Sequence, residues 1–360
     1  MRLHSSLIRL GLEWPIFQAP MAGVSTPQMA AAVSNAGGLG SIGVGNVDAA
    51  ATRKMIAAVR AETDRPFNVN VFCHRPATAD ERRQAAWLRR LQPEFARYGA
   101  SPPRTLTEIY RSFLVDDEKL AVLIEERPAV VSFHFGLPSA ERIAALKSAG
   151  ITLLASATDL EEAKSAAAAG VDGVIAQGYE AGGHRGTFDP RRPDDELGTT
   201  ALTRLLVKEL GVPVIAAGGI MDGAGVASVL NLGAVAAQLG TAFIACPESA
   251  ADEGYRAALS GPAARHTVMT RVISGRPARC LANKFTALGD DIESESIPDY
   301  PIAYDAGKAL NAAAKSAGEF GYGAQWAGQG APLARSLPAA RLVETLGVEL
   351  ETAIALQARG

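Results

Sequence analysis

Cysteines, aromatic residues and an excess of basic charge are all scarce in this chain of 360 residues. Its three cysteines, Cys73, Cys246 and Cys280, are odd in number and far apart, which argues against a disulfide framework and against a zinc site built from paired thiols. Lys and Arg together number 35 against 38 for Asp and Glu, so we expect no nucleic-acid partner. With 48% hydrophobic and 20% charged residues, the chain should fold around a large core.

Long hydrophobic segments are scarce as well. The longest stretch without a charged side chain runs from Gly223 to Pro247, and glycine and amide residues interrupt it, so it predicts a helix, a turn and a buried strand rather than a membrane span. The N-terminal segment MRLHSSLIRLGLEWP lacks the apolar run and the cleavage site of a signal peptide. We therefore expect a cytoplasmic protein with no membrane partner. The histidines, His4 among them, show no metal-ligand spacing, and we expect no metal.

Short apolar runs alternate with Ala-rich helical segments along most of the chain. Most of the runs are almost continuously apolar, which is typical of parallel strands buried on both faces. The alternation predicts an α/β protein with a (β/α)8 TIM barrel, and a doubly wound sheet is the alternative. The eight predicted strands are 16–19, 39–44, 67–72, 129–135, 151–155, 173–177, 214–217 and 234–239. Candidate helices between them are 27–36, 48–62, 139–148, 160–169, 200–210 and 223–232.

The ends of the predicted helices carry local signals. Asp159 is suited to cap the helix that begins at residue 160. The sequence GLGSIG at 38–43 matches the GxGxxG pattern of dinucleotide-binding loops, but it follows a helix and enters a strand, so it predicts a tight helix-to-strand turn. A glycine with positive φ commonly ends a helix. The glycines that follow predicted helices are Gly150, Gly170, Gly211 and Gly233.

One interval between predicted strands is much longer than the others. It separates the third strand from the fourth and has helical patterns at 79–98 and 106–126. After about Arg276 the strand rhythm is lost and helical patterns appear at 303–317 and 338–356. We therefore predict an additional α-helical region that covers the barrel mouth. The predicted division is a barrel of residues 1–73 and 128–275, and a helical region of residues 74–127 and 276–360.

Glycines follow the last two predicted strands. Gly218 and Gly219 come after the seventh strand, and Gly240 and Thr241 come after the eighth. In a TIM barrel the chemistry takes place at these C-terminal strand ends. Because glycine lets backbone N–H groups approach phosphate oxygens closely, the pattern predicts a site for the phosphate of a tightly held cofactor.

Three amide side chains, those of Asn70, Gln177 and Gln238, occur inside otherwise apolar strands. A buried amide costs free energy unless it has hydrogen-bond partners. A heterocycle with several donors and acceptors, such as an isoalloxazine ring, would satisfy all three. The alternative is that one or two of them bridge neighbouring strands.

Two histidines lie at the same predicted end of the barrel. His134 ends the fourth strand between apolar neighbours, where an imidazole can serve as a base or as the partner of an anion. A satisfied core histidine is the alternative interpretation. His184 lies on the Gly-rich loop after the sixth strand and is the second candidate.

Ten segments, spread over nearly the whole chain, match one known family. They are PIFQAPMAGVSTP, AVSNAGGLGSIG, PFNVNVFCHRP, VVSFHFGLP, IAQGYEAGGHRG, PVIAAGGIMDG, QLGTAFIACPES, SGRPAR, PDYPIAYDAGKAL and GAQWAGQGA. In these segments the chain resembles the FMN-dependent nitronate monooxygenases, formerly called 2-nitropropane dioxygenases. The histidine of VSFHFG and the tail tyrosines resemble those of the bacterial class I type. Enoyl-acyl-carrier-protein reductases and NADH:quinone reductases of the same superfamily share the glycine loops.

The resemblance implies a set of site residues. His134 matches the active-site histidine of the family, and FMN is the implied cofactor. The implied FMN contacts are Ala19, Pro20, Met21, Asn70, Gln177, Gly182, Gly183, Gly218, Gly219, Gln238, Gly240 and Thr241. The implied substrate-cavity residues are Tyr110, His184, Tyr255, Tyr300, Tyr304 and Lys308. On sequence alone, the tyrosines could equally be half-buried packing residues, and Lys308 a solvated helix residue.

The activity that the resemblance implies is oxidation of an alkyl nitronate, with propionate 3-nitronate as the candidate substrate. FMN and dioxygen would take part, and the products would be a carbonyl compound and nitrite or nitrate. An NADH-dependent quinone or enoyl reductase on the same barrel is one alternative. A non-catalytic binder of a phosphorylated ligand is the other, because a phosphate site does not by itself imply chemistry. The sequence predicts no oligomeric state.

Overall fold

The computed structural model of the protein describes residues 5, 9–289 and 291–357, so His4 and other parts of the N-terminal segment, residues 1–3 and 6–8, lie outside the described residues. Eight parallel strands form one sheet in the order β1-β9-β8-β6-β5-β4-β3-β2, and a parallel bridge between Phe17 and Leu39 joins its two edge strands. The sheet is therefore a nearly closed barrel, which confirms the predicted TIM barrel over the doubly wound sheet. The strands are β1 (Ile16–Gln18), β2 (Gly40–Gly43), β3 (Phe67–Phe72), β4 (Val130–His134), β5 (Thr152–Ala157), β6 (Gly173–Gln177), β8 (Val214–Ala217) and β9 (Ala236–Leu239).

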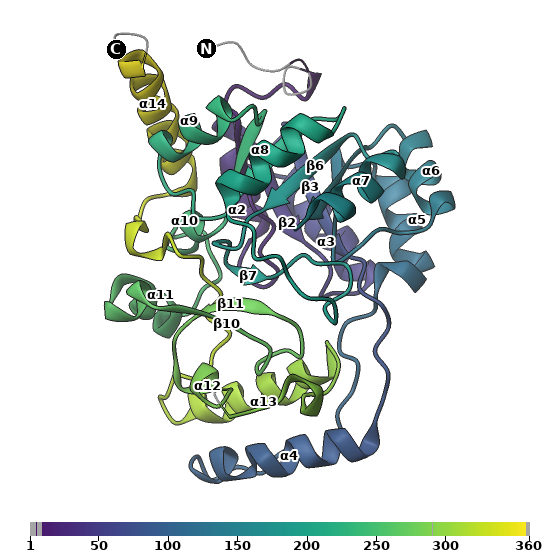
Figure 1. Cartoon of the computed structure of the whole chain (residues 1–360), viewed down its shortest axis with the longest axis vertical. Coiled ribbons are helices and arrows are strands. Elements are labelled where there is room, and N and C mark those ends of the chain that lie inside the picture. The colour runs from purple at the N-terminus through teal and green to yellow at the C-terminus, as the bar shows by residue number, and fades with distance from the viewer. Residues whose placement is uncertain (1–4, 6–8, 290, 358–360) are drawn as a thin grey trace.

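A ring of helices covers the outside of the barrel (Figure 1). The predicted helices of this ring are confirmed to within two residues at their ends. They are α2 (Pro27–Asn35), α3 (Ala49–Arg60), α6 (Ala140–Ser148), α7 (Leu160–Ala168), α8 (Thr199–Glu209) and α9 (Gly223–Asn231). The ring is completed by α5 (Asp117–Glu126) and α14 (Ala339–Gln357).

Helices α5 and α14 pack differently from the division that the sequence suggested. Helix α14 packs against α9 and α2, and Leu342, Leu346 and Leu350 share a core cluster with Ile16 and Met29. It therefore occupies the place of the eighth barrel helix. Helix α5 packs against α3 and α6, again on the barrel. A helix was expected over 106–126, but the observed helix α5 covers only the second half of that range. Before it there is only a 3-10 turn, η1 (Phe113–Val115).

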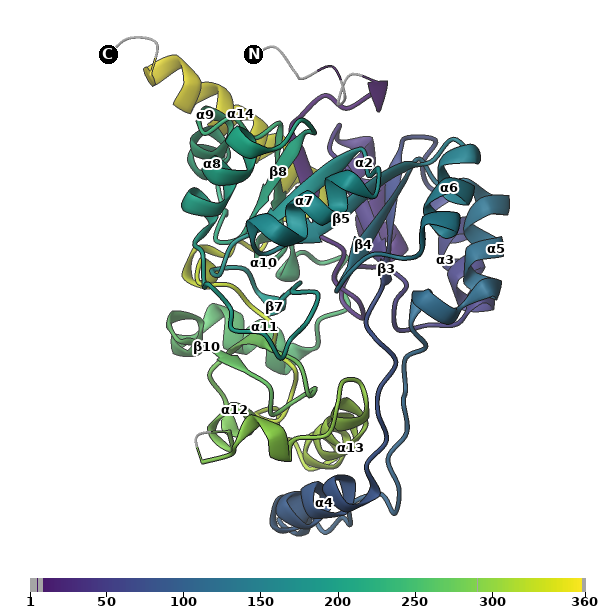
Figure 2. The same ribbon diagram turned by 45° about the vertical axis from the view of Figure 1, so that its right-hand side comes forward.

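The chain segments that do not belong to the barrel form a second region beside its mouth (Figure 2). Two long extended segments carry α4 (Glu81–Ala96) away from the barrel to α13 (Ile302–Ser316), where Trp87, Leu91 and Phe95 pack on Ile302 and Leu310. The smaller elements are α10 (Thr241–Ile244), α11 (Glu253–Ser260), α12 (Lys284–Ala287), η2 (Pro262–Arg265), η3 (Ser294–Ser296) and η4 (Ala331–Leu333).

A small antiparallel sheet, absent from the sequence prediction, ties this region to the barrel. Its strand order is β10-β11-β7, with β10 at Thr267–Thr270, β11 at Ala278–Leu281 and β7 at Gly183–His184. Strand β7 belongs to the loop that follows β6, so the sheet joins a barrel loop to the C-terminal excursion. Its strands are too short for a recognisable alternation of side chains.

The local signals at the helix ends are largely confirmed. The Asp159 side chain accepts a hydrogen bond from Glu162 N at 2.8 Å and so caps α7. Gly150, Gly170 and Gly233 have positive φ. The prediction for Gly211 is wrong: α8 ends through Leu210, which has extended backbone angles, and no left-handed residue is needed there.

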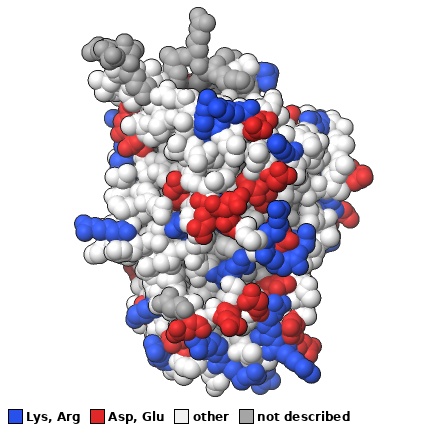
Figure 3. All heavy atoms as spheres, viewed as in Figure 1, with Lys and Arg blue, Asp and Glu red and all other residues white. Residues whose placement is uncertain are grey.

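Charged side chains of both signs are interspersed on the face shown in Figure 3. Within the described ranges, no helix is both long and apolar enough to span a bilayer. The same ranges contain no group of three His, Cys, Asp or Glu residues placed to hold a metal ion.

The turn at 38–43 generates a prediction about packing. A Cβ added to Gly40 would lie 1.9 Å from the carbonyl oxygen of Ala30 in α2, so α2 can approach β2 only because residue 40 is glycine. We expect Gly40→Ala to lower the free energy of unfolding by roughly 3 kcal/mol, measured by urea denaturation. Gly211→Ala is the matched control, because its Cβ would meet nothing within 4 Å and should leave stability unchanged or slightly higher. Equal stability of the two variants would contradict this account.

Candidate active site

A cavity opens at the C-terminal ends of the barrel strands, between the barrel and the second region. It contains all the predicted cofactor residues and all the predicted substrate residues except Lys308. The predicted residues that line it are Ala19, Pro20, Met21, Asn70, Tyr110, His134, Gln177, Gly182, Gly183, His184, Gly218, Gly219, Gln238, Gly240, Thr241, Tyr255, Tyr300 and Tyr304.

One side of the cavity is a cradle of glycines. Gly218 and Gly219, directly after β8, both have positive φ, of 130° and 69°. A Cβ on Gly218 would lie 2.6 Å from Thr199 Oγ1, and one on Gly182 would lie 2.4 Å from Gly328 N. Side chains at these positions would displace the neighbouring backbone and hydroxyl groups, so the wall consists of bare peptide groups. Such a wall fits a phosphate, whose oxygens need close approach to backbone N–H donors.

The three strand amides do not share one role. Asn70 Nδ2 donates to the Oγ and the carbonyl oxygen of Ser132, at 2.9 and 3.1 Å, and so bridges β3 and β4. Gln177 donates to His184 O at 3.0 Å and accepts from Gly186 N at 2.7 Å. These two amides have protein partners, as the alternative interpretation expected. In the part of the chain that the structure describes, the Gln238 side chain has no hydrogen-bond partner, and it faces the cavity.

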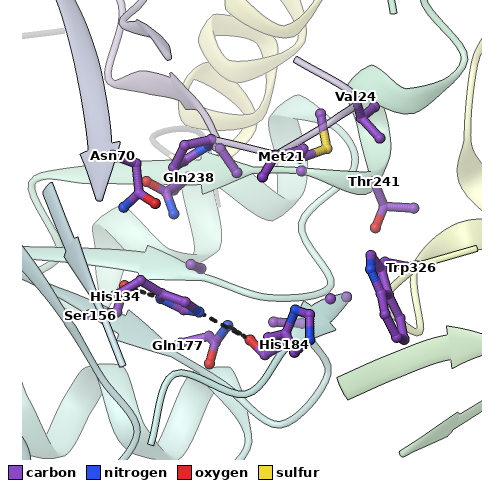
Figure 4. A pocket seen from close by; sticks show the side chains of 18 of the residues that line it. Met21, Val24, Asn70, His134, Ser156, Gln177, His184, Gln238, Thr241 and Trp326 are labelled. Atoms are coloured by element: carbon purple, nitrogen blue, oxygen red, sulfur yellow. Dashed lines mark hydrogen bonds between the residues drawn. The ribbon is translucent and has the colours of Figure 1, made fainter. Parts of the chain in front are cut away.

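His134, the last residue of β4, points into the cavity (Figure 4). Its Nε2 lies 3.2 Å from the carbonyl oxygen of His184, and its Nδ1 lies 3.0 Å from Ser156 Oγ. Because a carbonyl oxygen can only accept, Nε2 carries the proton, and Nδ1 accepts a hydrogen bond from the Ser156 hydroxyl. Burial, and then the positive charge of Arg276, lower the pKa of His134 to about 4, although the His184 carbonyl opposes the shift. The imidazole is therefore neutral at neutral pH.

The residue after His134 has an unusual backbone conformation. Phe135 has φ of 73°, which costs a non-glycine residue about 1–3 kcal/mol. The turn places its ring 4.4 Å from that of His134, 5.5 Å from Tyr300 and 5.6 Å from His184, measured between centroids. Phe135 is thus the centre of an aromatic wall on the histidine side of the cavity.

The tyrosines extend this wall, whereas Lys308 lies outside it. Burial raises the pKa of Tyr304 to about 12 and raises that of Tyr110 further, so both are neutral phenols. The Tyr255 hydroxyl donates to the carbonyl oxygen of Trp326. Lys308 is exposed on α13, and its ammonium lies 4.9 Å from the Tyr110 ring centroid and 5.5 Å from that of Tyr304. It contacts two residues that line the cavity without lining it itself.

Sequence reasoning missed several residues that line the cavity. Trp326 packs 5.0 Å from the His184 ring, and Ser156 bonds to His134. The segment GAQWAGQGA contains Trp326, but no feature of that segment indicates that Trp326 lies at the barrel mouth. Phe135 lies in VSFHFG beside His134, where its αL conformation leaves no signature in the sequence.

A nearly closed TIM barrel, with a glycine cradle and a half-buried neutral histidine at the C-terminal ends of its strands, is typical of an enzyme whose active site lies at that end of the barrel. Comparison with known proteins specifies the enzyme. The chain belongs to the nitronate monooxygenase family, whose sequence model matches residues 4–349.

Similar proteins cover almost the whole chain. A nitronate monooxygenase from Paraburkholderia phytofirmans is 66% identical over 345 residues, which are 96% of this chain and 94% of that protein. One from Pseudomonas aeruginosa is 56% identical over 95% of this chain and 97% of its own length. Among solved structures, a nitroalkane oxidase from Streptomyces ansochromogenes superposes with a TM-score of 0.89 at 43% identity, covering 98% of this chain and 100% of its own. FabK from Thermotoga maritima superposes with a TM-score of 0.75 at 31% identity, covering 100% of both chains.

The buried histidines generate a prediction about pH and stability. Burial lowers the pKa of His74 to about 3 and of His134 to about 4, and takes that of His184 well below its ordinary value. Below pH ~6.5 the unfolded chain therefore binds more protons than the folded one, so the free energy of unfolding falls as the pH falls. By pH ~5 the loss should be about 2 kcal/mol per histidine, measured by urea denaturation.

The pH prediction has a matched control. His134→Asn should remove part of the pH dependence, whereas His266→Asn, at an exposed position, should not change it. A free energy of unfolding that stays constant between pH 7 and pH 5 would contradict the assignment of these histidines as neutral in the folded state.

Proposed function

We propose that this enzyme binds FMN and oxidises anionic alkyl nitronates, with propionate 3-nitronate as the leading candidate, using dioxygen and releasing a carbonyl compound with nitrite or nitrate. The observation that carries the proposal is the pairing of a glycine cradle with a neutral histidine on opposite sides of one cavity. Within this proposal, the barrel holds the cofactor and the second region covers the substrate.

The cavity fits FMN at both ends of the cofactor. The glycine wall at Gly182, Gly218 and Gly219 suits the phosphate, since only glycine fits these positions. The Gln238 amide, which has no partner among the described residues, suits the polar edge of the ring system. FMN bound there would supply the electron acceptor for oxidation of the nitronate.

His134 and the aromatic wall would hold the nitronate. The wall excludes water, so a hydrogen bond from the cavity to a nitronate oxygen is stronger there than in solvent. The tyrosine hydroxyls are neutral donors because burial raises their pKa values. His134 can donate its Nε2 proton to an oxygen of the substrate if it gives up the His184 carbonyl.

The same geometry favours nitronates over neutral nitroalkanes. A neutral nitroalkane must first lose its α-proton, and a base with a pKa of about 4 accepts that proton poorly at neutral pH. The Nδ1 lone pair is also occupied by the Ser156 hydroxyl. A nitronate is already deprotonated, so the enzyme needs only to bind and orient it.

The first test is the visible spectrum of the purified holoenzyme. A flavin absorbance that bleaches on anaerobic addition of propionate 3-nitronate and recovers with dioxygen is the expected result. The control is NADH under the same conditions, which should leave the spectrum unchanged over the same time. Rapid bleaching by NADH, with no response to the nitronate, would favour the reductase alternative, and a colourless protein that binds no FMN would favour the phosphate binder.

The second test removes the histidine. His134→Asn should lower kcat/KM for the nitronate by ~100-fold, within the range seen for catalytic proton donors, while FMN remains bound at full stoichiometry. His266→Asn, an exposed substitution of the same kind, should retain wild-type turnover. Unchanged turnover of His134→Asn would rule out the assigned role.

A further inference from the structure

Arg276 is a buried cation beside the candidate active site, and the carboxylates of Glu162 and Asp189 raise its pKa only from beyond ion-pair distance. Its side chain is 3% exposed, and no carboxylate in the described ranges lies within ion-pair distance of it. Arg185, which is 2% exposed, has such a partner, because Asp194 lies 2.7 Å away. Burying a charge without an ion-pair partner is unfavourable, so a fold that retains one needs a reason to do so.

A tight turn holds Arg276 in this position. Gly275 has φ of 88°, and a Cβ there would lie 2.4 Å from Pro298 O, so only glycine fits. Ser274 Oγ donates to Arg276 O at 3.2 Å and also lies 2.9 Å from His184 Nε2, which links the turn to the cavity. The guanidinium donates to the carbonyl oxygen of Thr187. The charge is therefore fixed relative to the cavity wall.

The ring of Phe135, which lines the cavity, is in contact with this charge. The guanidinium carbon lies 4.2 Å from the Phe135 ring centroid, and the His134 ring lies 4.4 Å from the same centroid. The guanidinium remains protonated at neutral pH, because burial lowers its pKa only to about 10. Burial lowers the pKa values of His134, His184 and His74, and the positive charge of Arg276 adds to the shift, so these neighbours stay neutral and Arg276 is the charged member of this group.

We infer that Arg276 is a positioning residue that makes the cavity selective for anions, acting through the Phe135 ring without touching the substrate. This inference rests on the proposed function, in which the substrate is a nitronate anion. The strained Phe135 conformation then has a purpose: it places an apolar ring against the charge, so that water does not screen it there.

An anion bound in an outer pocket, rather than the substrate anion in the cavity, is the competing partner for the charge of Arg276. Arg276 also lines a separate pocket on the other side of Tyr300, together with Arg271 and Asp299. If an anion in that pocket neutralised Arg276, the field inside the cavity would be small. The experiments must therefore separate an anion in the cavity from one outside it.

The substrate test compares two buried, stacked arginines. Arg276→Gln should raise KM for propionate 3-nitronate about tenfold, as expected for one charge at this separation, and should change KM for neutral nitroethane less than twofold. Arg276→Lys keeps the charge and should restore the preference for the anion. Arg279→Gln is the matched control, because Arg279 is 3% exposed and stacks 4.8 Å from the Tyr179 centroid, away from the cavity wall. Equal changes for the anionic and neutral substrates would overturn the inference.

The pKa of His134 provides a second test, which does not depend on the substrate. The groups that face His134 are His184, Ser156 and, across Phe135, Arg276, with His74 and Tyr300 beyond that ring. In NMR titrations of the holoenzyme from pH 7 to pH 3, the pKa of His134 should rise in Arg276→Gln and stay unchanged in Arg279→Gln, because Arg276 is one of the groups that lower it. An unchanged His134 in Arg276→Gln would overturn the inference even if the enzyme oxidises nitronates. A shifted His134 in an enzyme inert toward nitronates would refute the proposed function alone.

The outer pocket is tested with inorganic phosphate. Calorimetric titration should show no phosphate binding that depends on Arg276. Binding that is lost in Arg276→Gln, in an enzyme whose preference for the anionic substrate is unchanged, would assign the charge to the outer pocket and overturn the inference.

Discussion

The candidate active site depends on the antiparallel pairing of β7 with β11. This pairing places His184 opposite Ala278 and Gly183 opposite Arg279. It thereby fixes the carbonyl oxygen of His184, which accepts hydrogen bonds from both His134 and Gln177. The tautomer of His134, the orientation of Gln177 and the position of the turn at 274–276 all follow from this short ladder. Two residues of strand connect the chemistry of the barrel to the region that covers it.

The barrel was predictable from the sequence because its strands are buried on both faces. The predicted limits of β3, β6 and β8 coincide with the observed ones, since each is an apolar run bounded by turn residues. The packing of helix α14 could not be predicted from the sequence in this way. Its pattern predicted a helix correctly, but an apolar stripe does not specify which surface it will cover, and α14 covers the barrel rather than its mouth.

The parts of the candidate site that lie at the ends of barrel strands could be predicted from the sequence. Strand ends can be located from the sequence, so His134, the glycine pair at 218–219 and the amides could be grouped before their geometry was known. Residues that reach the cavity through the second region could not be located by the same reasoning. An isolated antiparallel bridge to Cys280 positions Trp326, and the Lys308 ammonium lies over the rings of Tyr110 and Tyr304. Neither position follows from the spacing of neighbouring residues in the sequence.

The position of α14 constrains how the protein can be made. The helix that completes the barrel is far along the chain from the residues on which its apolar stripe packs, Trp14, Ile16 and Met29. Residues 339–357 must therefore leave the ribosome before the ring of helices can close. Until then, the N-terminal strand and α2 keep an uncovered apolar surface, so nascent or prematurely terminated chains are the forms that require protection by chaperones.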